Sequence, residues 1–224
     1  MARLAPRSPR RDDPGTRGRL LETAGLVFAE RGFDRATSKE ICDRAGTNTA
    51  AVNYYFGGIA GLYEAVLEEI PRRLVTIEAI SSAMDATDGH APDRLSAFTG
   101  VVVGALTGPA AASWPLRVIA RELVAPASIR DGLRLRGMYP GGRLLRALVS
   151  ELTGLPDDHP DVAPACLSVA APFLMLLICD RPTLDALFPG LGLDAADSEA
   201  LADRIVRFTL GGLTGIAAPD RGNP

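Results

Sequence analysis

Hydrogen-bonding side chains gather in two short stretches on either side of Gly46. Ser38 and Lys39 open the first stretch. The second stretch contains a run of polar, small and aromatic residues, namely Asn48, Thr49, Ala50, Asn53, Tyr54 and Tyr55. Hydroxyl, ammonium and amide groups of these types bind phosphate oxygens and the polar edges of bases, and an exposed methyl group packs on thymine. These residue types can therefore contact nucleic acid if the fold places them on one surface.

Two short helices are expected to position these side chains. In the first, Thr37 and Glu40 have the spacing of a capping box, which satisfies the free amides at the start of a helix. Ile41 and Ala45 form its buried face, and Gly46 can adopt the left-handed conformation that ends it. The pattern predicts a helix that starts beside Thr37 and stops at Gly46.

The second helix of the pair follows this glycine. Asn48 can cap its start, and Val52 and Phe56 lie four residues apart on its buried face. Two short helices that meet at a glycine turn form a helix-turn-helix.

The remaining helices follow from the spacing of apolar residues. An apolar stripe predicts a helix from Thr16 to the stop at Gly32, and a long helix is expected from Ile59, with Pro71 kinking or breaking it. Further helices are expected over residues 93–106, 114–124, 126–138, 141–152, 162–179 and 197–216. No alternating apolar run is long enough for a sheet, so the predicted fold class is all-α.

Charge is distributed unevenly along the chain. The net charge of the 224 residues is −3, but residues 1–19 hold six arginines against two aspartates. Beyond Ile80, 12 basic residues face 16 acidic ones. This indicates that the N-terminal end meets a polyanion. The leader, expected to be disordered over residues 1–15, is either an arm that enters a minor groove or a solubilising tail.

Several other classes of protein are disfavoured by the sequence. No apolar run has the length of a membrane span, and the start of the chain lacks the apolar core of a signal peptide, so we expect a soluble, cytoplasmic protein with no membrane partner. The three cysteines, Cys42, Cys166 and Cys179, lack the paired spacing of a metal site or a disulfide framework and are expected to be reduced, buried thiols.

Enzyme chemistry also finds little support. The two histidines, His90 and His159, lie in expected loops without a nearby nucleophile motif. The run Gly190-Leu191-Gly192 lacks the third glycine and the preceding strand of a nucleotide-binding fingerprint. We therefore expect no catalytic residue, no metal and no cofactor.

Residues 16–74 resemble the N-terminal domain of the TetR family of regulators. The matching residues are Thr37-Ser38-Lys39-Glu40-Ile41-Cys42, Ala45-Gly46, Ala51-Val52, Tyr54-Tyr55-Phe56-Gly57 and Leu62-Tyr63. The run from Asn48 to Gly57 is most similar to the subgroup that includes CecR. Arg121-Glu122-Leu123 followed by Pro126, and Glu151-Leu152-Thr153-Gly154, also resemble that subgroup.

The resemblance implies a homodimer that binds a palindromic operator in double-stranded DNA. Residues 48–55 would be the recognition helix in the major groove. Thr49, Ala50 and Asn53 would face bases, Ser38, Lys39, Tyr54 and Tyr55 would bind phosphates, and Asn48 would also belong to the DNA-binding residues. Alternatively, the two tyrosines are half-buried packing residues.

The resemblance divides the chain into a helix-turn-helix domain of residues 16–62, a helical effector-binding and dimerisation domain of residues 63–217, and a tail of residues 218–224. Residues 165–179 and the last helix, with Leu201, Ile205, Phe208, Gly212 and Ile216, would form the dimer interface. Alternatively, both segments are core helices of a monomer.

The C-terminal domain would also hold the pocket for a small-molecule effector that releases a repressor from DNA. The expected lining residues are Phe98, Trp114, Arg117, Arg121, Met138, Tyr139, Phe173 and Met175. Alternatively, the apolar ones are plain core residues, and Arg121 forms a structural ion pair with Glu122.

The chain departs from the family pattern after Gly57. A helix cap and a phosphate-binding lysine usually follow, and here those positions hold Gly58 and Ile59. Since isoleucine carries no charge, one phosphate contact per subunit is expected to be missing, unless Arg17 or an arginine of the leader replaces it. The alternative function is a helical ligand-binding or interaction protein with weakened or lost operator binding.

Overall fold

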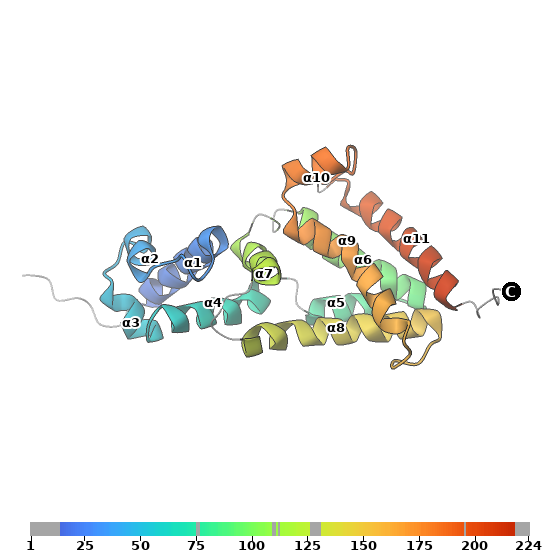
Figure 1. The fold of residues 1–224 in the computed structure, drawn as a ribbon, viewed down its shortest axis with the longest axis horizontal. Helices are drawn as coiled ribbons and strands as arrows, with labels where there is room; N and C mark the ends of the chain where they lie inside the picture. The colour runs from blue at the N-terminus through green and yellow to red at the C-terminus, as the bar shows by residue number, and fades with distance from the viewer. Residues whose placement is uncertain are drawn as a thin grey trace, which may run out of the picture. The chain divides into compact units, whose positions relative to one another are not determined.

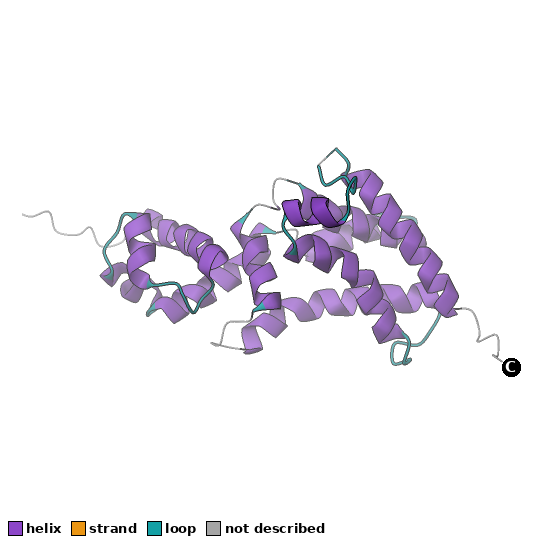
Figure 2. Cartoon of the chain, turned by 45° about the horizontal axis from the view of Figure 1, so that its top comes forward, coloured by secondary structure: helices purple, strands orange, loops and turns teal. Residues whose placement is uncertain are grey.

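The computed structural model of the chain describes residues 14–74, 77–108, 111, 113–125, 131–194 and 196–217, with the backbone alone for residues 14 and 131–140. The leader up to residue 13 and the tail of residues 218–224 lie outside this range. The described part contains eleven helices and no strand, which confirms the all-α class (Figure 2). Two compact units are present, and the boundary between them, at Val66 and Leu67, falls inside α4.

The first unit consists of α1 (Pro14–Arg31), α2 (Ser38–Ala45), α3 (Ala50–Phe56) and the start of α4 (Ile59–Arg73) (Figure 1). Its core is formed by the apolar faces predicted from the sequence, with Leu20, Ala24, Val27, Phe28, Ile41, Val52, Leu62 and Val66 all buried. The ring of Phe28 packs edge-on against that of Tyr63, with 4.8 Å between the centroids. Burial of these side chains fixes α2 and α3 against α1 and α4.

The second unit contains α5 (Ile77–Asp85), α6 (Ala91–Thr107), α7 (Trp114–Val124), α8 (Asp131–Thr153), α9 (Val162–Ile178), α10 (Arg181–Leu187) and α11 (Ser198–Ala217). Helix α6 packs against α5, α8, α9 and α11. Buried apolar residues from these helices, including Met84, Leu95, Val103, Leu148, Val169 and Leu213, form one core.

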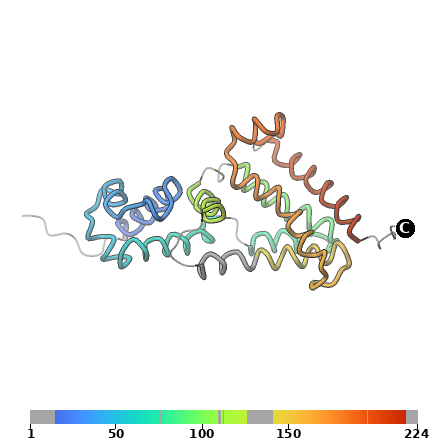
Figure 3. The backbone as a smooth tube through the Cα atoms, viewed as in Figure 1, coloured from blue at the N-terminus to red at the C-terminus, as the bar shows by residue number. Residues whose placement is uncertain are grey.

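Three predictions about the helices need correction. The expected helices of residues 126–138 and 141–152 are joined in one helix, α8, from Asp131 through Pro140 to Thr153, while residues 126–130 lie outside the described residues. A proline removes only the bond to the carbonyl four residues earlier, so a long helix can continue past it. Helix α10, which the backbone trace of Figure 3 shows between α9 and α11 along the chain, was not predicted. The carboxylate of Asp180 caps this helix by accepting a hydrogen bond from the amide of Thr183 at 2.8 Å. The long helix from Ile59 ends at Arg73, two residues after Pro71 where a kink or break was expected, and the separate helix α5 that follows was not predicted.

The core of the second unit contains one buried hydroxyl that lacks a partner in the described part of the chain. Thr99 of α6 is fully buried, and its Oγ1 makes no hydrogen bond there. On the same helix the buried hydroxyl of Thr107 donates to the carbonyl of Val103 at 2.9 Å. A buried hydroxyl without a partner has lost its hydration without compensation.

Replacing Thr99 by valine is therefore expected to raise the free energy of unfolding by about 1–2 kcal/mol, because a methyl group takes the place of an unpaired hydroxyl. Chemical denaturation followed by circular dichroism measures the change. The matched variant Thr107→Val loses a hydrogen bond and is expected to be no more stable than the wild type. A Thr99→Val protein that unfolds more easily than the wild type would contradict the assignment.

Candidate nucleic-acid interface

The start of α2 is fixed by the residue before it. Thr37 has an extended backbone, and its Oγ1 accepts a hydrogen bond from the amide of Glu40 at 3.2 Å, as predicted for the capping box. Ser38 follows as the first residue of the helix and is half-buried, whereas Lys39 is exposed. The two predicted phosphate-binding residues thus lie on the first turn of α2, where amide dipoles also favour an anion.

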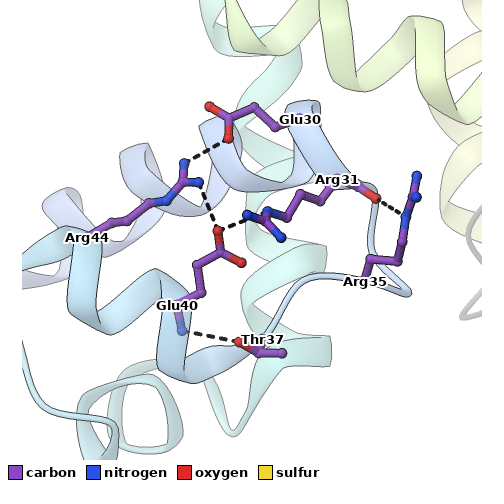
Figure 4. Close-up of polar contacts among 6 residues, drawn as sticks. All are labelled: Glu30, Arg31, Arg35, Thr37, Glu40 and Arg44. Carbon is purple, nitrogen blue, oxygen red and sulfur yellow. Dashed lines mark hydrogen bonds and ion pairs between the residues drawn. The ribbon is translucent and has the colours of Figure 1, made fainter.

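A network of ion pairs joins α2 to α1 (Figure 4). The carboxylate of Glu40 binds Arg31 Nε at 3.0 Å and Arg44 Nη2 at 2.8 Å, and Arg44 Nη1 binds Glu30 at 2.8 Å. The hydrogen bond from Arg44 to Glu30 raises the pKa of the Arg44 guanidinium. The positive charges of Arg31 and Arg44 are therefore compensated within the protein.

The turn between α2 and α3 is formed as the sequence predicts. Gly46 has a φ of +66°, and the amide of Thr47 returns to the carbonyl of Cys42 at 2.9 Å. A side chain at this position would be strained. The Oδ1 of Asn48 accepts from the amide of Ala51 at 3.1 Å, so this asparagine caps α3. Because its Oδ1 is engaged in this capping bond, Asn48 is less able to accept a hydrogen bond from DNA.

Helix α3 has one buried and one exposed face. Val52 is fully buried, whereas Thr49, Ala50 and Asn53 are all exposed. Tyr54 is 65% exposed, and its ring meets that of the half-buried Tyr55 edge-on at 4.9 Å. The structure therefore brings the predicted base-reading residues onto a single accessible face, next to one exposed tyrosine.

The C-terminal end of α3 is shaped by two glycines. Gly57 and Gly58 have φ values of +71° and +121°, and Ile59 begins α4 as a half-buried residue. The guanidinium of Arg17, from the first turns of α1, lies over the ring of Phe56 at 5.1 Å from its centroid. The sequence did not predict this contact, because residues nearly forty positions apart meet only in the folded unit.

A direct contact between two of the predicted effector residues is present in the described part of the chain. Phe98 and Phe173 are buried in the core, where their rings meet edge-on at 5.7 Å. Trp114 is also buried, and the guanidinium of Arg73 lies over its ring at 5.2 Å. Arg117 is exposed and Arg121 is half-buried.

The three remaining effector candidates are Met138, Tyr139 and Met175. Met175 lies at the surface and is not enclosed. Its Sδ accepts a hydrogen bond from the Sγ of Cys179 at 3.3 Å. The side chains of Met138 and Tyr139 lie outside the described residues. Among the expected lining residues, Phe98 and Phe173 are therefore the two that the described contacts show to be neighbours.

The expected dimer helices have exposed apolar faces. On α9 these are Leu167, Leu174, Met175 and Ile178. On α11, Phe208 is 86% exposed, whereas Leu201, predicted for the same interface, is buried in the core of its own chain. Leu201 and Phe208 are seven residues apart and so lie on nearly the same side of α11, which means that this side is covered at Leu201 but not at Phe208.

The structure also bears on the cysteines, on metal binding and on membrane spans. The cysteines are free, but only Cys42 is buried; Cys166 and Cys179 are half-buried, which corrects the expectation for these two. Burial raises the pKa of the Cys42 thiol. It also raises the pKa of the Cys166 thiol, although this residue is more exposed. Among the described residues no cluster of three or more potential metal ligands occurs, and no helix is long and apolar enough to cross a membrane.

Two family models match the chain. The model for bacterial regulatory proteins of the tetR family matches residues 20–66, and the model for the C-terminal domain of the HTH-type transcriptional dual regulator CecR matches residues 91–213. The second match alone covers more than half of the chain.

Two curated transcriptional regulators are similar to part of the chain. The chain is 29% identical over 108 residues to the HTH-type transcriptional regulator BetI 2 of Chromohalobacter salexigens, covering 46% of this chain and 50% of that protein. It is 33% identical over 88 residues to BetI of Klebsiella pneumoniae, covering 39% and 44%. The chain thus spans half or less of the length of the curated relatives that it matches.

Solved structures extend the similarity of fold to nearly the whole chain. The fatty acid degradation regulator FadR from Bacillus halodurans superposes with a TM-score of 0.64 at 18% identity, over 92% of this chain and 99% of the other. The ketosteroid transcriptional regulator KstR2 of Mycobacterium tuberculosis superposes with a TM-score of 0.62 at 18% identity, over 90% and 96%.

Proposed function

Because the chain belongs to the TetR family of transcriptional regulators, with a C-terminal domain of the CecR type, we propose that it is a repressor that leaves a palindromic operator when a small molecule binds its second unit. The observation that carries the DNA-binding part is the exposed face of α3. Thr49, Ala50 and Asn53 lie there without cover from their own unit, opposite the buried Val52. A major groove admits a helix with such a face.

The proposed repressor acts as a homodimer. One short recognition helix makes too few base contacts for specificity, and a two-fold dimer doubles them. The exposed Phe208 and the apolar surface of α9 support this assembly. Three glycines of α11 also support the dimer, namely Gly211, Gly212 and Gly215. A Cβ atom at any of these positions would meet nothing within 4 Å in its own chain. Glycine weakens a helix, so we infer that a partner approaches these positions closely.

The effector would act through the continuity of α4, which contains residues of both units. A two-fold dimer reads half-sites about 34–36 Å apart, so a small movement of α4 in each subunit would change the fit of the two recognition helices. For the effector we propose a small molecule that binds near Phe98 and Phe173, with Arg121 as a polar anchor. Binding to one state only would shift the equilibrium away from DNA.

The DNA-binding part is tested with DNA from upstream of the protein's own gene. In a gel shift, the wild type should bind this DNA more tightly than a scrambled duplex of equal length. Asn53→Ala should weaken the specific complex about tenfold to 100-fold, because an asparagine that pairs with adenine contributes about 1–3 kcal/mol of discrimination. Binding to the scrambled duplex should change little.

Equal binding of the wild type and Asn53→Ala to the upstream DNA would exclude α3 as the reading helix. A second candidate function also has support, since no lysine or arginine occurs between Arg44 and Arg72. A helical ligand-binding or interaction protein would need no such charge. A wild type that shifts no DNA, while its helical spectrum is intact, would favour this candidate.

A further inference from the structure

The proposed recognition helix carries no positive charge. Residues 45–71, which include all of α3 and most of α4, contain neither lysine nor arginine. Most of the affinity of proteins for DNA comes from cations that neutralise phosphates, and phosphates line both sides of the groove that α3 would enter. If α3 binds DNA as proposed, the cations at its ends must come from other elements.

Most arginines on α1 and α2 are engaged by their own unit. Arg31 and Arg44 are compensated by Glu30 and Glu40. The Nη2 of Arg19 donates to the hydroxyl of Thr16 at 2.8 Å. Lys39 lies at the start of α2, before the turn that leads to α3.

Arg17 is placed differently from these residues. It is exposed, and its guanidinium lies over the ring of Phe56, the last residue of α3, at 5.1 Å from the centroid. A guanidinium that is held over a ring by cation–π attraction keeps N–H groups that can bind a phosphate with two parallel hydrogen bonds. The ring also holds the side chain in place, which lowers the entropy lost on binding.

We propose that Arg17 binds a DNA phosphate at the C-terminal end of α3, that Phe56 positions it, and that it supplies the charge that α3 and Ile59 lack. This inference rests on the proposed DNA-binding function. It assigns a role in binding to a residue of α1, outside the helix-turn-helix, and to the half-buried ring of Phe56.

The experiment measures how binding depends on salt, which counts phosphate contacts without knowledge of the operator. The probe is a labelled duplex of mixed sequence of about 30 base pairs, titrated with the full chain at about 50 to 200 mM salt. Each lost contact lowers the slope of log K against log salt by ~0.9. Arg17→Gln should therefore lower the slope by ~0.9 per bound subunit and weaken binding roughly tenfold per subunit near 0.1 M salt.

Three variants separate this contact from a general effect of charge. Arg17→Lys keeps the cation and should keep most of the slope. Arg143→Gln removes an equal charge from an exposed position of α8 in the second unit and should leave the slope unchanged. Ile59→Lys in the Arg17→Gln protein should restore the slope, because it returns a cation next to the end of α3. Circular dichroism confirms that each variant is folded.

Three outcomes would count against either the proposed DNA-binding function or the role of Arg17. A wild type that does not bind the duplex at low salt would overturn the proposed DNA-binding function and this inference with it. A wild type that binds with a steep salt dependence, together with a folded Arg17→Gln protein of equal slope, would overturn the inference alone. An equal loss of slope in Arg143→Gln would also overturn it, since the effect would then follow net charge.

Discussion

Replacing Phe208 by glutamate is expected to convert the proposed dimer into a monomer. Phe208 is 86% exposed in its own chain, which is unusual for so large an apolar side chain on a well-formed helix. Aromatic residues at the centre of an interface often contribute about 2–4 kcal/mol to association. A carboxylate at this position would also have to lose its hydration in the interface. The dissociation constant of the dimer should therefore rise roughly 100-fold or more.

Light scattering at micromolar concentration checks this result, because the chain mass is 23.6 kDa and a dimer has twice that mass. The matched control is Val124→Glu, which places the same charge at another exposed apolar residue, at the end of α7. The control protein should remain a dimer and keep its affinity for the operator. A wild type of single-chain mass would exclude the dimer itself, and a dimeric Phe208→Glu protein would exclude this part of α11 from the interface.

The loss of the dimer should be visible in DNA binding too. A monomer contacts one half-site, so the affinity for a palindromic operator should fall far more than the affinity for a single half-site. Comparison of the two duplexes distinguishes a lost dimer from a damaged recognition helix, which would weaken both to the same extent.

Local signals explain why the helix-turn-helix could be predicted in detail. The cap at Thr37, the left-handed Gly46 and the cap at Asn48 act over three or four residues, and each is found where the sequence indicates. The apolar spacing of α1 likewise selects its buried face, because a helix that packs on one side needs a stripe of this period.

Predictions that depended on tertiary packing were less complete. The pattern of α11 grouped Leu201 with Phe208, and in the structure the first is buried and the second is exposed. Residues seven apart lie on nearly the same side of a helix, so spacing along one helix cannot tell how far along that side the rest of the chain covers it. Spacing also cannot predict the contact of Arg17 with Phe56, because only the folded unit brings these two residues together. The continuous α8 shows that a single proline does not always end a helix.

Replacing Phe28 by alanine is expected to have the largest effect on the stability of the first unit. The side chain is 1% exposed, and it packs against the rings of Tyr63 and Phe33 at centroid distances of 4.8 and 6.3 Å. Removal of a buried phenyl ring leaves a cavity and lowers the free energy of unfolding by about 3–5 kcal/mol. A small unit has a total stability near the lower end of 5–15 kcal/mol, so much of the population should lose its native structure.

Urea denaturation followed by circular dichroism should then show an early transition for the first unit and a later one, close to that of the wild type, for the second. DNA binding should be lost, whereas the mass of the proposed dimer should not change, because α9 and α11 belong to the second unit. Phe33→Ala provides the matched control. Its ring belongs to the same aromatic cluster but is only half-buried, so its loss should lower the stability by about 1–2 kcal/mol. If Phe28→Ala instead unfolds in a single transition and loses its dimeric mass, the two units do not unfold independently, and the stability of the DNA-binding face depends on the whole chain.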